Sequence, residues 1–235
     1  MISTFTITIF TFIPKFYLSF LTSSLLGKSL KKNIWNIKVI NIRDFSIDSI
    51  HNIDSTIFGG GPGMLMRVDV INNFLKSFFP YKKPKKIIYF SPRGIKVKQR
   101  YIQKLAKLDN IGLLCGKFEG IDQRIFDFWN IEEISLGDFI LSGGDVAAAA
   151  LIESIVRLLP GVLGNKFSLE EESFSSGLLE YDNYTRPKNW RGSFVPNILI
   201  SGDHSKISVW KNVKSKYITR FKRPDLWEGY LKSKL

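Results

Sequence analysis

Short apolar or alternating stretches recur along the chain, and they predict β-strands. In residues 4–12, threonines alternate with Phe and Ile, which is the period of two expected of a strand. Residues 111–115 and 131–135 are short apolar runs, and residues 35–42 and 86–90 are also predicted to be strands. Because these runs are separated by longer segments, the pattern predicts an α/β protein with a mostly parallel sheet.

Helical segments are expected between the predicted strands. The pattern predicts helices at about 15–26, 67–78 and 96–108, and a further helix from Asp145 to about Leu159. Asp145 is expected to be the N-cap of this last helix. Residues 146–152 contain no polar side chain, so we expect that part of the helix to be buried on every side. Its alanines permit close approach of another backbone, in the core or in a dimer.

Three of the predicted strands end in turns that contain glycine: residues 91–94, 116–120 and 136–144. Glycine lets a ligand approach the backbone N–H and C=O groups, because no Cβ is in the way. Loops that follow parallel strands meet at the carboxyl edge of the sheet, where ligands bind in open α/β folds. The turns therefore point to one small-molecule site, although glycine spacing alone equally fits ordinary strand-to-helix turns.

The net charge of +13 and the sequence pI of about 9.7 indicate a partner that is a polyanion. The lysine-rich composition also fits A/T-rich codon usage, so the distribution of charge is more informative than its total. Residues 80–108 contain ten Lys or Arg and no Asp or Glu, and residues 183–235 contain twelve against three. These two basic regions are candidate phosphate-binding surfaces.

A single cysteine, Cys115, excludes a disulfide framework, and the two histidines are far from it in sequence, so no metal site is expected. We expect a cytoplasmic protein. The apolar N-terminus is interrupted by Pro14 and Lys15 and has no basic region or cleavage site, so neither a signal peptide nor association with a membrane is predicted.

The composition becomes polar and acidic at residues 165–176, and this stretch is predicted to be a flexible linker. It separates a first domain, residues 1–164, from a small and mostly helical domain, residues 177–235. We expect the core of the second domain to comprise its large apolar residues, namely Trp190, Phe194, Ile198, Ile200, Ile207, Trp210, Tyr217, Phe221, Leu226 and Trp227.

Several longer motifs carry a resemblance to a known family. They are GGGPGMLM from residue 59, YFSPRG from 89, LLCGKFEGIDQRI from 113, ISLGDFILSGGD from 134, LIESIVRLLPGVLGN from 151 and SFSSGLLEYDNYTRP from 173. In this order they resemble the bacterial tRNA (guanine-N1)-methyltransferases of the SPOUT class, the TrmD family. The N-terminal strand and the KRPDLW segment near the C-terminus also fit.

The resemblance implies a parallel sheet flanked by helices and tied in a deep trefoil knot. It implies methylation of N1 of the guanosine that is 3′-adjacent to the anticodon in tRNA, with S-adenosylmethionine as the methyl donor, by a cytoplasmic homodimer. The first domain would bind S-adenosylmethionine and the helical C-terminal domain would bind tRNA. No tightly bound metal is implied.

The resemblance also implies site residues. Those expected to bind the methyl donor are Tyr89, Ser91, Pro92, Gly94, Gly116, Glu119, Leu136, Gly137, Asp138, Phe139, Ile140, Leu141, Gly143 and Gly144. Those expected to bind the tRNA substrate are Gly59, Gly60, Gly61 and Arg186. Glu172 would be the general base, where the family has aspartate, and Arg157 would stabilise the charge on O6 of the guanine. Residues 182–187 depart from the family's HYTRP pattern.

Two other interpretations remain open on the sequence. The first is a non-catalytic RNA-binding protein that retains the fold, and the absence of donor binding would support it. The second is a nucleotide-dependent enzyme with a Rossmann-type sheet. The glycines at 59–63 lack the third glycine of the dinucleotide fingerprint, which argues against the second interpretation.

Overall fold

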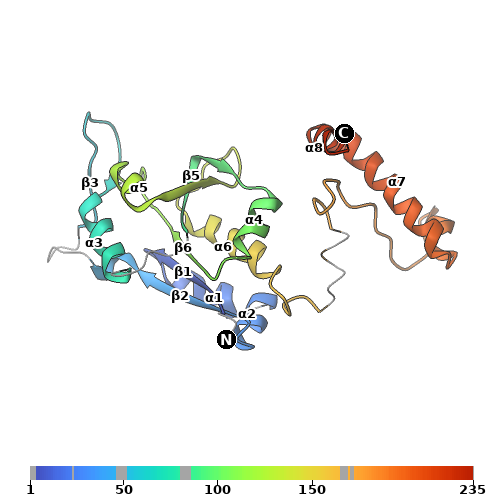
Figure 1. Cartoon of the computed structure of the whole chain (residues 1–235), viewed down its shortest axis with the longest axis horizontal. Helices are drawn as coiled ribbons and strands as arrows, with labels where there is room; N and C mark the ends of the chain where they lie inside the picture. Colours follow the sequence, from blue (N-terminus) through green and yellow to red (C-terminus); the bar gives the residue numbers. More distant parts are fainter. Residues whose placement is uncertain are drawn as a thin grey trace. The chain divides into compact units, whose positions relative to one another are not determined.

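The computed structural model describes residues 4–22, 24–45, 52–79, 86–164, 169 and 172–234. The chain divides into two compact units, Met1–Gly164 (unit 1) and Asn165–Leu235 (unit 2), coloured blue to yellow and orange to red in Figure 1. Half of the predicted linker, namely residues 165–168 and 170–171, falls outside the described residues.

Unit 1 is built on a five-stranded sheet. Its strands are β1 (Phe5–Thr11), β2 (Trp35–Asn41), β5 (Ile87–Lys96), β6 (Asn110–Leu114) and β7 (Ile131–Ser135). They lie in the order β2-β1-β6-β5-β7, and every neighbouring pair is parallel. The parallel α/β sheet predicted from the apolar runs is confirmed.

Helices cover both faces of this sheet (Figure 1). Four helices contribute to the core on one face: α1 (Lys15–Thr22), α2 (Ser24–Lys31), α4 (Gln99–Leu105) and α6 (Asp145–Val156). On the other face are α3 (Val68–Phe78) and α5 (Arg124–Trp129), with a 3₁₀ helix, η1 (Ile42–Phe45). The sheet is therefore the middle layer of a three-layer unit.

Alternation along the strands supplies both cores. In β1, Ile7 and Ile9 belong to the α1/α2/α4/α6 core, whereas Phe10 belongs to the α3/α5 core. In β6, Leu113 and Leu114 divide in the same way. Successive side chains point to opposite faces of a strand, so runs that are apolar throughout fit strands with helices on both sides.

The structure corrects several details of the sequence-based prediction. The segment predicted as one helix at 15–26 forms two, α1 and α2. Strand β5 extends to Lys96, and its register against Ile134 of β7 shifts between Phe90 and Ile95. The intervening residues 91–94 therefore bulge from a strand that continues, whereas the sequence predicted that the strand would end there.

Helix α6 also differs from its prediction. Its N-cap is Gly144, and Asp145 is the first helical residue with a buried side chain. The helix is not buried on every side, because Val146 is 56% exposed and Ala150 is exposed. An apolar sequence shows that a helix lacks a polar face, but it does not show how many neighbours cover that helix.

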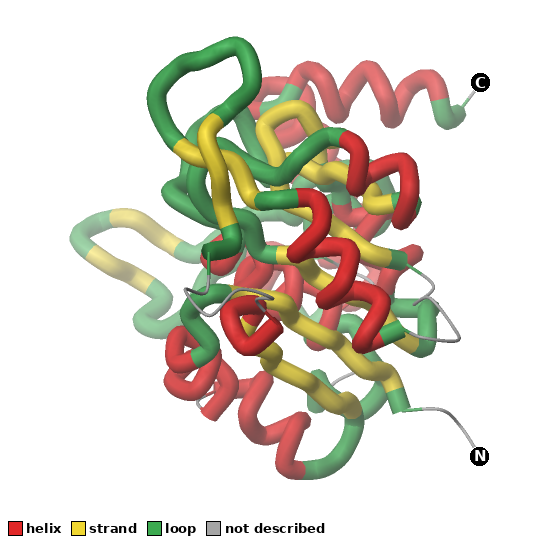
Figure 2. Tube along the Cα trace, turned by 90° about the vertical axis from the view of Figure 1, so that its left-hand side faces the viewer, coloured by secondary structure: helices red, strands yellow, loops and turns green. Residues whose placement is uncertain are grey.

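A hairpin that the sequence did not predict is formed by β3 (Asp54–Thr56) and β4 (Met64–Met66). Its connecting loop, at the top front of Figure 2, extends beyond the sheet. The φ values of Gly59, Gly60 and Gly61 are 88°, 80° and 119°, a left-handed conformation that glycine adopts without strain. The neighbouring Phe58 is 98% exposed.

Unit 2 contains a short hairpin, β8 (Asn189–Trp190) and β9 (Ser193–Phe194), a 3₁₀ helix η3 (Asn197–Ile200), and two helices, α7 (His204–Lys222) and α8 (Pro224–Lys232). Asp203 caps α7 by accepting a hydrogen bond from the backbone N–H of Lys206. Within the described part of the chain, no helix is long and apolar enough to cross a membrane.

The core predicted for unit 2 is largely wrong. Among its described residues, only Leu178, Ile218 and Thr219 are buried. Half of the predicted core residues are exposed, namely Trp190, Phe194, Ile200, Tyr217 and Phe221. Apolar character shows which side chains gain from burial, but the described elements of this unit do not cover them.

Candidate active site

The candidate site is a cavity of about 610 Å³ at the carboxyl edge of the unit 1 sheet. It is lined by residues 90–93 of β5, residues 116–121 after β6, and residues 134–137 and 139–144 at the end of β7 and beyond it. These segments lie in or directly after three neighbouring parallel strands, so the sheet topology itself brings them together. A volume of this size is typical of small-molecule sites.

The cavity brings together twelve of the fourteen residues that the sequence predicted to bind the methyl donor. They are Tyr89, Ser91, Pro92, Gly116, Glu119, Leu136, Gly137, Phe139, Ile140, Leu141, Gly143 and Gly144. Their role in binding remains a prediction, but all twelve line the same cavity.

The other two, Gly94 and Asp138, are not among the residues that line the cavity. A Cβ added to Gly94 would overlap the backbone of Ile134, so this glycine allows β5 and β7 to approach each other closely. The exposed carboxylate of Asp138 pairs with the ammonium of Lys96 at 2.7 Å. In this structure both residues support the walls of the cavity from outside.

Glycines allow two of the loops to pack directly against each other. The N–H of Gly144 donates to the carbonyl of Gly116 at 3.0 Å. A Cβ on Gly144 would lie 3.0 Å from the Cα of Cys115, and one on Gly116 would overlap the ring of Tyr89. Any larger side chain at these positions would therefore separate the loops that form the cavity.

The β3–β4 hairpin joins the cavity at its base. The N–H of Glu119 donates to the carbonyl of Met64 at 2.9 Å, and the N–H of Met66 donates to the carbonyl of Gly120 at 3.0 Å. Leu65 lines the cavity. The predicted substrate-binding residues Gly59–Gly61 thus lie at the exposed tip of a hairpin whose base forms part of the cavity wall.

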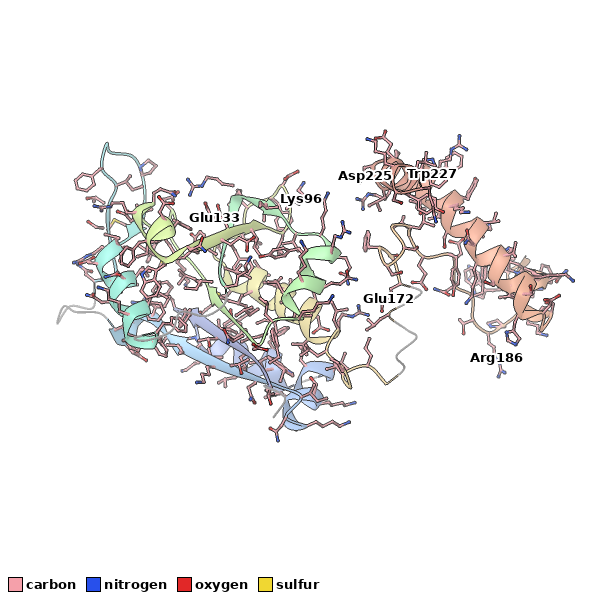
Figure 3. All side chains as sticks on the ribbon, in the orientation of Figure 1. Lys96, Glu133, Glu172, Arg186, Asp225 and Trp227 are labelled. Atoms are coloured by element: carbon pink, nitrogen blue, oxygen red, sulfur yellow. The ribbon has the colours of Figure 1, made fainter. Side chains whose placement is uncertain are left out.

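Charged groups that the sequence analysis missed lie at the rim. The guanidinium of Arg93 contacts the carboxylate of Glu133 and the amide oxygen of Gln123, each at 3.2 Å. Glu133, on β7, is labelled in Figure 3. Burial, and secondarily the charge of Glu133, raises the pKa of Tyr89 to about 12, so its phenol is neutral. Arg93 lies in the YFSPRG motif and Gln123 in the LLCGKFEGIDQRI motif. Membership of these motifs was the only feature of the sequence that could have identified them as site residues.

A buried polar cluster underlies the loops. The hydroxyl of Thr11 and the hydroxyl of Tyr17 both donate to Oδ1 of Asp145, the latter at 3.0 Å, and Tyr17 also lies 3.3 Å from Sγ of Cys115. Burial, followed by the proximity of Cys115 and Asp145, raises the pKa of Tyr17. Because Asp145 directly follows Gly144, this cluster joins β1, α1 and β6 to the start of α6 beneath the cavity.

The two predicted catalytic side chains belong to different units. Arg157 is half-buried at the C-cap of α6 in unit 1. Glu172 is half-buried in unit 2, where its backbone carbonyl accepts a hydrogen bond of 2.7 Å from the hydroxyl of Ser175. Arg186 is also in unit 2; it is exposed and extends away from α7 (Figure 3). Among the residues that the structure describes, no cluster of His, Cys, Asp and Glu could hold a metal ion.

Comparison with known proteins gives a consistent result. Residues 5–229 match the family model described as tRNA (Guanine-1)-methyltransferase TrmD. A tRNA (guanine-N(1)-)-methyltransferase of Ehrlichia ruminantium strain Welgevonden is 48% identical over 223 residues, which cover 94% of this chain and 95% of the relative.

The proteins of the same name from Pelagibacter ubique strain HTCC1062 and Wolbachia pipientis wMel are 48% and 46% identical. Their alignments cover 96% and 98% of this chain, and 98% of each relative. The relatives therefore match both units along nearly their whole length, and the chain belongs to the TrmD family of tRNA (guanine-1)-methyltransferases.

Proposed function

We propose that this protein transfers a methyl group from S-adenosylmethionine to N1 of the guanosine that is 3′-adjacent to the anticodon in tRNA. The observation that carries the proposal is the cavity formed by the β5 bulge and the loops after β6 and β7, in a chain that belongs to this family. The relatives named above are tRNA (guanine-N(1)-)-methyltransferases, which supports the same reaction here.

The residues present fit the methyl donor. Apolar side chains such as Leu65, Ile140 and Leu141 offer surfaces for an adenine ring, and the glycine-bearing loops leave backbone groups accessible for hydrogen bonds. The carboxylate of Glu119, which lines the cavity and is exposed, can face a positive group of the donor. When bound, S-adenosylmethionine supplies an electrophilic methyl group.

The chain must then activate the guanine. N1 carries a proton at neutral pH, so a base must accept that proton while negative charge develops on O6. We assign the first role to the carboxylate of Glu172 and the second to the guanidinium of Arg157. Glutamate differs from the family's aspartate by one methylene, which leaves the acid–base chemistry unchanged.

The partners follow from the same proposal. We assign donor binding to unit 1, and we propose that unit 1 has the deep trefoil knot implied by the family. We assign tRNA binding to the basic unit 2, working in the cytoplasm. The exposed apolar side chains of Phe139, Ile140, Leu141 and Val146, in and next to the cavity wall, support a homodimer in which a second copy covers that surface.

Nucleoside analysis tests the reaction directly. Unmodified tRNA transcript is incubated with methyl-labelled S-adenosylmethionine, digested, and analysed for 1-methylguanosine. A transcript with adenosine in place of the target guanosine is the control and should acquire no label. Binding of tRNA with no affinity for the donor would instead identify a non-catalytic RNA-binding protein.

Mixing variants tests whether the site is shared between subunits. Arg157→Ala removes the proposed stabiliser of O6, and Gly144→Val disrupts the cavity wall. Each variant alone should be inactive, and a mixture should regain part of the activity if the two functions come from different chains. A wild-type protein that is fully active as a monomer would contradict the shared site.

A further inference from the structure

The β8–β9 hairpin of unit 2 exposes two large aromatic side chains. Trp190 is 62% exposed and Phe194 is 70% exposed. The connecting residues Arg191 and Gly192 have φ values of 52° and 82°, as in the type I′ turn of a tight hairpin. Both rings are therefore exposed on a tight hairpin and do not belong to a core.

The register places the rings on opposite faces of the hairpin. Trp190 lies opposite Ser193, and Phe194 lies opposite Asn189. Directly opposed residues share a face and successive residues alternate between faces, so Trp190 and Phe194 point to opposite sides. The two strands form a sheet of their own among the described strands.

One cation contacts the Trp190 ring, and two more precede the hairpin in sequence. The guanidinium of Arg191 lies 5.0 Å from the centroid of the Trp190 ring, a cation–π arrangement. Arg186 and Lys188 immediately precede the hairpin, and Tyr184 is 46% exposed. Residues 183–202 contain no Asp or Glu. The segment therefore combines exposed aromatic rings with uncompensated positive charge.

We propose that the β8–β9 hairpin binds unpaired nucleotides of an RNA loop, with Trp190 stacking on a base and Arg191 contacting a phosphate. This rests on the proposed function only in taking the RNA to be tRNA. Aromatic and cationic side chains in alternation are the chemistry by which proteins hold single-stranded nucleic acid. Bases within a duplex are already stacked on both faces, so an exposed ring requires unpaired ones.

Charge favours RNA over a protein as the occupant. A protein surface that covered Trp190 and Phe194 would also have to supply carboxylates for Arg186, Lys188 and Arg191. An RNA loop supplies base faces and phosphates together. The cations then gain affinity by releasing counterions, in addition to the stacking.

The test uses the full-length chain and two RNA probes, a tRNA anticodon stem-loop and a blunt duplex of the same stem sequence. The dissociation constants are measured by fluorescence anisotropy at fixed salt. Trp190→Ala should weaken binding of the stem-loop about 5- to 150-fold and leave binding of the duplex unchanged. Trp190→Phe should retain most of the affinity, because it keeps a ring that can stack.

Phe128→Ala is the matched control. Phe128 is an aromatic residue with 60% exposure, but it lies on α5 of unit 1 and does not line the cavity. We expect this variant to bind both RNAs as the wild type does. Arg191→Ala should reduce the slope of log K against log salt by about 0.7, the contribution of one phosphate contact on a single strand.

Three outcomes would overturn the proposal: unchanged binding of the stem-loop by Trp190→Ala, equal weakening of stem-loop and duplex, or loss of dimer in sedimentation without loss of RNA affinity. The last would make the hairpin a contact between copies of the chain. Failure of the proposed function is separate. It would be a wild type that methylates no tRNA yet still binds the stem-loop through Trp190.

Discussion

Units 1 and 2 bury their apolar side chains in contrasting ways. In unit 1, two continuous cores lie on the two faces of a parallel sheet, and residues such as Ile9, Leu113 and Ile152 are completely inaccessible. In unit 2, the described residues include three buried ones, Leu178, Ile218 and Thr219, while many of the aromatic and aliphatic side chains are exposed.

The contrast suits the two units to the different functions proposed for them, donor binding in unit 1 and tRNA binding in unit 2. A unit with layered cores is rigid enough to hold loops at fixed positions, and the proposed donor cavity is formed by such loops. A unit that leaves aromatic and basic side chains exposed cannot gain much stability from its own packing, but it can present those side chains to a partner.

Separating the units should have the largest effect. A fragment of residues 1–164 should fold and bind S-adenosylmethionine while losing affinity for tRNA, because both cores and the cavity lie within it. A fragment of residues 165–235 should not unfold cooperatively, since a unit of this size with few buried residues lacks sufficient hydrophobic stabilisation. Thermal melts followed by circular dichroism and calorimetric titration with the donor measure both. A sharp melting transition of the smaller fragment would remove the contrast.

Changing the proposed base should affect rate without affecting either binding function. Glu172→Gln is expected to lower the rate of methylation by about 10²–10⁴-fold, the usual contribution of a general base, while the affinities for donor and tRNA stay unchanged. Glu172→Asp should keep substantial activity, because aspartate is the family's residue. Near-normal turnover by Glu172→Gln would mean that this position is only part of an acidic surface, and Glu171 would be the next candidate.

Shortening an apolar side chain should have very different consequences in the two units. Leu113→Ala removes a fully buried side chain from β6 and should lower the free energy of unfolding by about 2–5 kcal/mol. Val213→Ala shortens a side chain on α7 that is 59% exposed, and the change should stay within about 0.5 kcal/mol. Denaturant titration of the full chain compares them. Equal losses would show that Val213 is covered in solution, as by a second copy.

The buried polar cluster should affect both stability and donor binding. Asp145→Asn replaces a carboxylate that accepts hydrogen bonds from Thr11 and Tyr17, and should cost about 1–3 kcal/mol of stability. Because Asp145 adjoins Gly144, the affinity for the donor should fall while the affinity for tRNA stays unchanged. Ser154→Ala, at a hydroxyl elsewhere on α6 that donates to the carbonyl of Ala150, is the control. If donor affinity survives in Asp145→Asn, the cluster stabilises the fold alone.

Four strands of the unit 1 sheet could be predicted closely from the sequence alone, whereas β5 continues to Lys96 beyond its predicted end and the β3–β4 hairpin was not predicted. Residues 131–135 were predicted as a strand and form β7 with the same bounds, and the runs predicted for β1, β2 and β6 differ by one residue at one or both ends. Local alternation and apolar runs determine strands because they depend on neighbours in sequence. Parallel pairing then places the β5 bulge and the segments after β6 and β7 at one edge.

Which apolar groups are covered, and which loops contact each other, could not be predicted from the sequence. The exposure of Val146 on α6, of Trp190 on the β8–β9 hairpin and of Phe221 on α7 depends on the presence or absence of distant segments, which no local period encodes. The same holds for Asp145. Its sequence position suggests a helix N-cap, but its carboxylate accepts hydrogen bonds from the hydroxyl groups of Thr11 on β1 and Tyr17 on α1, which are distant in sequence. Periodicity fixes the direction in which a side chain points, and long-range packing fixes what it meets there.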